Sequence, residues 1–128
     1  MATLAGRKLV QVALTVKDLD RARVFYRDTL GLPLMFEAGH MLFFDIGGQR
    51  LMVGLAEHPD KPVGRGTYIY FDAPDVMTLR EDLKAKGVEL IGNVETLQRT
   101  DTHELKLQFF KDPDGNEMGL MGMVLKAA

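Results

Sequence analysis

The chain repeats one pattern of residues twice, and this internal repeat limits the possible folds more than any other feature of the sequence. In each copy an alternating apolar run is followed by an aspartate, a helical apolar stripe and a glycine. An offset of about 57 residues places Asp18 on Asp75, and one deletion later Gly31 falls on Gly87. Each aspartate can cap a helix, and each glycine can supply the left-handed residue that ends it. We therefore expect two equivalent modules.

Apolar runs separated by turn residues predict one strand before and three strands after each helix. The strands expected in the first copy are Val10–Val16, Leu34–Ala38, Met41–Ile46 and Arg50–Leu55. The strands expected in the second copy are Thr67–Phe71, Glu95–Arg99, Glu104–Lys111 and Glu117–Leu125. Each copy therefore has the order β-α-β-β-β, and the predicted fold class is α+β.

The length of 128 residues fits one domain, 1–128, built from both copies. Module one is expected at about 8–57, a linker at about 58–66 and module two at about 67–125. Neither module can bury its sheet alone, so we expect the two to pair edge to edge and curve around a shared cleft. An ordinary α+β sandwich with coincidental symmetry is the alternative, and the matched landmarks favour the repeat.

Composition excludes several classes of protein and site. The chain has no cysteine, which excludes disulfides, thiolate metal sites and a cysteine nucleophile. Sixteen basic and eighteen acidic residues give a net charge of −2 with no basic run, so the sequence predicts no nucleic-acid partner. Its apolar stretches are shorter than a bilayer span, so it predicts no membrane partner. We expect a soluble cytoplasmic protein.

Two motifs resemble a known family. They are Val16–Ala22, running into Phe25–Leu32, and the turn Phe110–Asn116. In these residues the chain is similar to the vicinal oxygen chelate superfamily, which includes glyoxalase I, bleomycin-resistance proteins, fosfomycin-modifying enzymes and extradiol dioxygenases. The resemblance covers nearly the whole chain. It implies paired βαβββ modules that form a cup-shaped half-barrel, a homodimer, and a reactive site inside the cup.

The resemblance also implies four metal-ligand positions, which fall on Gln11, Met52, Tyr68 and Gly119. Family members that hold a metal there use His or Gln, then Glu, His and Glu. A thioether, a neutral phenol and a glycine are poor substitutes, and one amide cannot hold a hard divalent cation. We therefore predict no metal at these positions and no cofactor, and the catalytic residues are unknown. Three histidines are expected to be solvated turn residues: His40, His58 and His103.

Strand alternation predicts which side chains line the cup. The predicted ligand-binding residues are Gln11, Ala13, Met52, Tyr68, Tyr70, Leu107, Phe109, Gly119 and Met121. The same face is expected to include Thr15, Arg50, Gly54, Leu105, Glu117 and Met123. An apolar wall with a few polar groups is typical of small-molecule sites. The alternative is that these side chains simply form core or, for Met121 and Met123, a dimer contact. The repeat predicts a Gln11–Tyr68 pair across the cup and an Arg50–Glu117 salt bridge at its rim.

These observations leave three functional hypotheses. The first is a homodimer that binds a small hydrophobic or aromatic molecule without a metal, similar to the bleomycin-resistance branch. The alternative is an enzyme of the same superfamily, of the lyase, isomerase or dioxygenase type, with a non-standard or absent metal site. In that case Tyr68 or Glu117 would act as acid or base, although the sequence shows no activating partner for either. The third is a structural or regulatory module. The sequence favours binding over catalysis.

Overall fold

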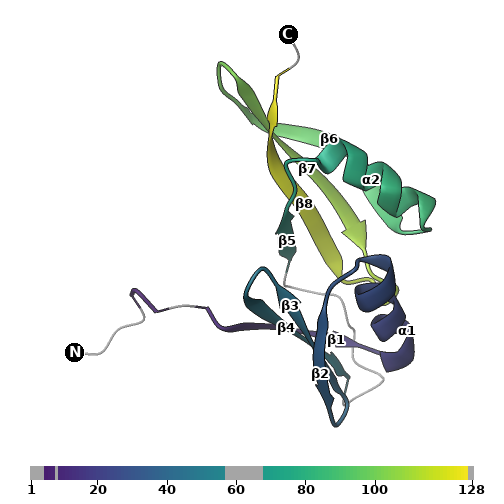
Figure 1. Cartoon of the computed structure of the whole chain (residues 1–128). Helices are drawn as coiled ribbons and strands as arrows, with labels where there is room; N and C mark the ends of the chain where they lie inside the picture. Colours follow the sequence, from purple (N-terminus) through teal and green to yellow (C-terminus); the bar gives the residue numbers. More distant parts are fainter. Residues whose placement is uncertain (1–4, 8, 57–67, 127–128) are drawn as a thin grey trace. The chain divides into compact units, whose positions relative to one another are not determined.

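A computed structural model of the chain describes residues 5–7, 9–56 and 68–126. The chain divides into two compact units, Met1–Glu57 and His58–Ala128, and each contains one four-stranded mixed sheet. The predicted α+β class with two βαβββ modules is confirmed (Figure 1). The predicted linker and His58 lie outside the described residues. None of the helices in the described ranges has the length and apolar character of a membrane-spanning helix.

The sheet of the first unit has the strand order β1-β4-β3-β2. Its strands are β1 (Gln11–Val16), β2 (Leu34–Ala38), β3 (Met41–Ile46) and β4 (Gln49–Leu55). The hairpins β2–β3 and β3–β4 are antiparallel, whereas β1 pairs with β4 in parallel. Strand β1 begins one residue later than predicted, and Val10 is exposed in front of it.

The helical segment of the first unit has two parts, α1 (Leu19–Arg23) and a π-helix, η1 (Val24–Thr29). The predicted Asp18 cap is confirmed, because its backbone is extended and its Oδ1 accepts a hydrogen bond of 3.0 Å from the Arg21 amide. Gly31 ends the segment with φ of +74°, also as predicted. The wider π-helical turn accompanies two successive buried rings, Phe25 and Tyr26.

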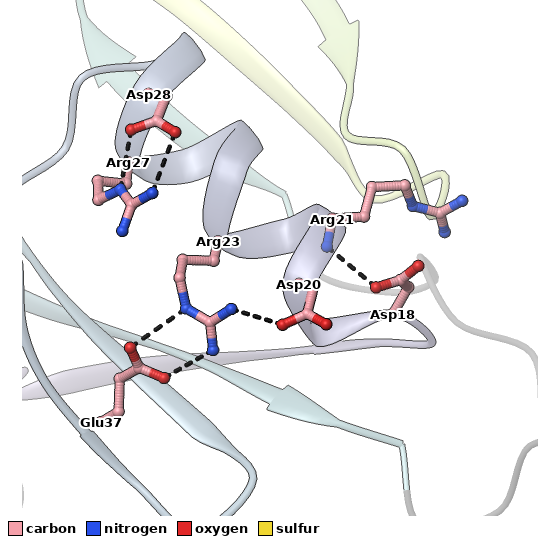
Figure 2. A network of polar contacts seen from close by, with 7 residues as sticks. All are labelled: Asp18, Asp20, Arg21, Arg23, Arg27, Asp28 and Glu37. Atoms are coloured by element: carbon pink, nitrogen blue, oxygen red, sulfur yellow. Dashed lines mark hydrogen bonds and ion pairs between the residues drawn. The ribbon is translucent and has the colours of Figure 1, made fainter.

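An ion-pair network joins α1 to β2 (Figure 2). The Arg23 guanidinium donates from Nε and Nη2 to the two carboxylate oxygens of Glu37, at 3.2 and 2.7 Å, and from Nη1 to Asp20 at 2.6 Å. Two parallel N–H···O bonds to one carboxylate fix both the distance and the orientation. The hydrogen bond with Arg23 lowers the pKa of Glu37, and its two acidic partners raise the pKa of Arg23.

The two faces of the first sheet differ in burial: one is packed, and the other, which we call its open face, is mostly exposed or half-buried, although Phe43 is buried within it. The packed face contains Leu14, Val16, Leu42, Phe44, Leu51 and Val53, which are all buried. Tyr26 of η1 covers this face, with its ring 5.7 Å from that of Phe44. On the opposite face Ala13 and Thr15 are exposed, as the period of two predicts.

The sheet of the second unit has the order β5-β8-β7-β6, which repeats the topology of the first. Its elements are β5 (Ile69–Asp72), α2 (Val76–Ala85), β6 (Glu89–Arg99), β7 (His103–Lys111) and β8 (Glu117–Leu125). Strand β6 begins well before the predicted Glu95. Its register against β7 shifts between Ile91 and Glu95, where Gly92 has φ of +66°. A bulge therefore lies within β6, before the residue at which the sequence predicted the strand to begin.

The packed face of the second sheet lies toward α2, which contacts β6, β7 and β8 (Figure 1). Its buried side chains include Phe110, Met118 and Leu120. The fully buried Gln108 also lies on this face, where its Oε1 accepts a hydrogen bond of 2.8 Å from Arg80 of α2. Its Nε2 donates to the carbonyls of Ile91 and Gly92, both at 3.2 Å. These two carbonyl groups of the β6 bulge therefore have a hydrogen-bond partner.

The two helix starts differ. Asp75 makes no side-chain cap hydrogen bond, so the cap predicted there is wrong. Its φ of −97° and ψ of 31° are not the extended values from which a side chain turns back to the first N–H groups. The Val76 amide instead donates to the Ala73 carbonyl at 3.1 Å. The predicted end of this helix is confirmed, since Gly87 has φ of +84°.

The predicted turn between β7 and β8 is built on Asp112. Its buried carboxylate accepts hydrogen bonds from the amides of Asp114, at 2.9 Å, and Asn116, at 2.7 Å. The Asn116 side-chain amide donates to the other oxygen at 2.7 Å. Gly115 adopts the positive φ of +88° that the turn requires. This turn sets the position at which Glu117 enters β8.

Candidate functional site

The open face of the second sheet, opposite α2, carries the predicted site residues of that unit. Strand register places Tyr70 of β5 beside Gly119 of β8, and Gly119 beside Phe109 of β7. In the next row along β7 and β8, Leu107 lies beside Met121. The rings of Tyr68 and Tyr70 each lie 6.1 Å from that of Phe109, so three aromatic side chains meet over β7. The structure thus brings these six residues together on one face.

Gly119 lies directly under the ring of Tyr70. A Cβ atom at this position would be 2.7 Å from Tyr70 Cδ1 and 3.1 Å from Leu107 Cδ1, both closer than van der Waals contact. The absence of a side chain is therefore what lets Tyr70 pack against β8. The sequence predicted Gly119 as a missing metal ligand and as a residue of the lining, but it did not reveal this contact, because the distance to Tyr70 depends on strand register.

Tyr68 and Glu117 form a pair on this open face. Tyr68 lies just before β5, and about half of the residue's surface is exposed (51%). A hydrogen bond to Glu117 raises the pKa of Tyr68, because the phenol must keep its proton to donate to the carboxylate. The sequence showed no partner for either residue, and the structure pairs the two with each other. The predicted Gln11–Tyr68 and Arg50–Glu117 pairs join the two units and stay predictions.

The open face of the first sheet carries the predicted residues of module one. Parallel pairing places Gln11 beside Arg50 and Ala13 beside Met52. The Gln11 Nε2 atom lies 3.8 Å from Met52 Sδ, at the range of a weak N–H···S hydrogen bond. The amide of Gln11 therefore has a local partner, which the sequence did not reveal.

Two aromatic residues of this face were missed by the sequence prediction. Phe43 of β3 lies beside Met52, and Phe36 of β2 lies beside Phe43, with the two rings stacked at 4.3 Å. A row of side chains thus crosses all four strands of the sheet: Ala13, Met52, Phe43 and Phe36. The run Met41–Phe44 is wholly apolar and gives no alternation. The tight turn at Gly47 and Gly48 was the available signal, because it fixes the register of β3 on β4.

The residues at the four family positions do not fit a divalent metal. Gln11 and Met52 present an amide and a thioether that contact each other, Tyr68 holds its proton toward Glu117, and Gly119 has no donor. Among the described residues there is no group of three or more His, Cys, Asp or Glu side chains that could hold a metal ion. His40 lies in the exposed turn between β2 and β3, as expected, whereas His103 is the first residue of β7 and not a turn residue.

Comparisons with known proteins agree on one family. A family model described as the Glyoxalase/Bleomycin resistance protein/Dioxygenase superfamily matches residues 8–120. Glyoxalase 1 of Caenorhabditis elegans is 23% identical over 120 residues, which are 90% of this chain and 42% of that protein, so the chain spans less than half of it. The uncharacterized protein YraH of Bacillus subtilis (strain 168) is 26% identical, over 91% of this chain and 99% of its own length. A crystal structure of a superfamily member from Sphaerobacter thermophilus DSM 20745 matches with a TM-score of 0.73 and 22% identity, over 90% of this chain and 96% of that one.

Proposed function

Because the chain belongs to the Glyoxalase/Bleomycin resistance protein/Dioxygenase superfamily, we propose that it binds a small hydrophobic or aromatic molecule in the cup of a homodimer, without a metal at the usual positions. The observation that carries this proposal is the packing of Tyr70 over Gly119. At the position where relatives with a metal are expected to have a carboxylate, this chain has an aromatic surface. Such a surface suits an apolar ligand better than a cation.

Each sheet supports the proposal with its own open face. In the first unit Phe36, Phe43 and Met52 lie side by side, and in the second Tyr68, Tyr70 and Phe109 meet. Aromatic rings supply large apolar contact areas with defined geometry, and a methionine adapts to irregular ligand shapes. The polar groups beside them are few, as in most sites for small organic molecules.

Calorimetry and metal analysis test this proposal. The wild-type protein should bind one or more members of a panel of neutral aromatics, beginning with 2-naphthol, saturably and without a metal retained after dialysis. Tyr70→Ala and Phe43→Ala should each weaken binding about tenfold, as for the loss of an aromatic contact. Met77→Ala is the matched control, because Met77 is exposed on α2, away from the open face.

Two outcomes would contradict the proposal. Stoichiometric Ni, Zn, Mn or Fe that survives dialysis would overturn the absence of a metal centre. Failure of every aromatic in the panel to bind would overturn the binding function.

The Tyr68–Glu117 hydrogen bond favours a second candidate, a cofactor-free enzyme of the lyase or isomerase type. Glu117 would act as the base, and Tyr68, whose pKa is raised, would keep its proton and orient the carboxylate. Proton exchange of 2-acetylnaphthalene in D₂O, followed by NMR, tests this role. Exchange faster than in buffer, lost in Glu117→Gln and reduced in Tyr68→Phe, would support catalysis, and exchange at the buffer rate would refute it.

A further inference from the structure

Within the first unit, the guanidinium group of Arg50 on β4 has no hydrogen-bond or ion-pair partner among the described residues. Its Nε atom is buried and makes no hydrogen bond, and no ion pair of this side chain is found among the described residues. The guanidinium carbon lies 5.8 Å from the centre of the Phe43 ring, within the range of a cation–π contact. Buried polar atoms are nearly always hydrogen-bonded, so an unpaired charged donor calls for an explanation.

The carboxylate directly across from Arg50 accepts a hydrogen bond from another group. Asp45 of β3 is the direct cross-strand neighbour of Arg50, yet its Oδ1 accepts a hydrogen bond of 3.0 Å from the Gly48 amide. The turn between β3 and β4 thus holds Asp45. The other direct neighbour of Arg50 is Gln11, whose side-chain amide lies beside Met52 Sδ. Neither neighbour uses the donors of the guanidinium.

We propose that Arg50 binds the acidic group of the ligand, which is therefore a planar aromatic molecule with a carboxylate or similar oxyanion. A guanidinium offers paired N–H donors whose spacing matches a carboxylate. Phe43 fixes this group from one side, and its stacked neighbour Phe36 extends the apolar surface for the ring of the ligand. The inference rests on the proposed binding function and names its ligand class.

A matched pair of probes tests this selectivity: 2-naphthoate and its neutral analogue 2-naphthamide, titrated by calorimetry at low salt. The wild-type protein should bind 2-naphthoate about tenfold more tightly than 2-naphthamide, because one charge-assisted contact distinguishes the two probes. In Arg50→Gln the preference should vanish, while the affinity for 2-naphthamide changes less than twofold. Arg27→Gln is the control, because Arg27 lies on η1 and pairs with Asp28.

A second variant should raise the affinity for the acidic probe, and this test does not require Arg50→Gln to be stably folded. Asp45→Asn removes the negative charge beside Arg50 and keeps an oxygen that can accept from Gly48, so it should tighten binding of 2-naphthoate alone. Equal affinities of the two probes for wild type, or a preference that survives in Arg50→Gln, would overturn this inference. Equal affinities would also be expected if Arg50 pairs with Glu117. If the protein binds neither probe and does not bind 2-naphthol, both the proposed function and this inference are refuted.

Discussion

At the scale of single residues, three glycines of the sheets differ in what a methyl group would meet. At Gly54 of β4 the nearest atoms would be 3.7 Å away, an ordinary contact. At Gly119 the ring of Tyr70 would be 2.7 Å away. At Gly122 the new atom would overlap the backbone carbonyl of Ala73, which cannot move as a side chain can. A glycine-to-alanine substitution should therefore lower the free energy of unfolding by a different amount at each of the three positions.

We predict that Gly54→Ala leaves the free energy of unfolding nearly unchanged, whereas Gly119→Ala lowers it by about 1–3 kcal/mol through overpacking. Gly122→Ala should be more damaging than either. In a Tyr70→Ala background the cost of Gly119→Ala should largely disappear, because the clashing ring is gone. Urea denaturation measures all of these differences. Equal costs at positions 54 and 119 would contradict the contact with Tyr70.

Gln108 gives a second prediction at this scale. Gln108→Leu keeps the volume but removes the partner of Arg80 and of the Ile91 and Gly92 carbonyls. The free energy of unfolding should fall by about 1–3 kcal/mol, the cost of buried groups left unpaired. Gln98→Leu, at an exposed position of β6, is the matched control and should have little effect. A stability of Gln108→Leu equal to wild type would show that water satisfies the bulge.

At the scale of elements, the two aspartates that precede the helices make a matched comparison. Asp18 accepts the Arg21 amide and Asp75 accepts no cap hydrogen bond, although the repeat aligns them. We expect Asp18→Ala to lower the free energy of unfolding by about 1 kcal/mol, the usual value of a helix cap. Asp75→Ala should change it much less. Thermal denaturation of the two variants tests this asymmetry, and equal losses would contradict it.

The Arg23–Glu37 pair predicts a dependence of stability on pH. Because Arg23 lowers the pKa of Glu37 in the folded protein, the pair stabilises the fold above the usual carboxyl pKa of 4.5. This contribution is lost as the pH falls through the lowered pKa. Glu37→Gln should therefore lower Tm slightly at neutral pH, and this effect should disappear once the pH has fallen below the lowered pKa of Glu37. Glu95→Gln, at an exposed position of β6, should show no such change, and a pH-independent effect of Glu37→Gln would refute the ion pair.

Sequence patterns predicted the elements where one local rule decided them. Apolar runs bounded by turn residues placed β2, β3 and the turn at Asp112 correctly. The predictions failed where the deciding contact is not local. The start of β6 depends on Gln108, which is distant in sequence and donates a hydrogen bond to the Gly92 carbonyl in the bulge. A residue type that can cap a helix does so only from an extended backbone, which Asp75 lacks.

At the scale of the whole molecule, the proposed homodimer is directly measurable. Light scattering coupled to size-exclusion chromatography should give twice the chain mass of 14.3 kDa. Saturating 2-naphthoate should raise Tm at fixed protein concentration, since a ligand that binds only the folded state stabilises it. A mass of one chain at every concentration tested would contradict the dimer and leave the aromatic faces as features of a monomer.

The repeat predicted the two modules because the residues that define each copy lie close together along the chain. The lining of the open faces was predicted only in part. Ala13, Met52 and Tyr70 follow from alternation, whereas Phe43 follows from the pairing of β3 with β4, which no alternation in Met41–Phe44 reveals. For a uniformly apolar strand such as β3, the strand register is needed as well as the sequence to predict which side chains lie on the open face.

Strand β3 carries one more consequence. It lies between β2 and β4, so both of its edges are hydrogen-bonded within the native sheet. Its run Met41–Phe44 combines high hydrophobicity with no charge and no proline, the signature of segments that assemble into intermolecular β-structure once exposed. Variants that open the first unit should therefore precipitate rather than accumulate as dispersed unfolded chains, and the yield of dissolved protein after heating would report on the integrity of that unit.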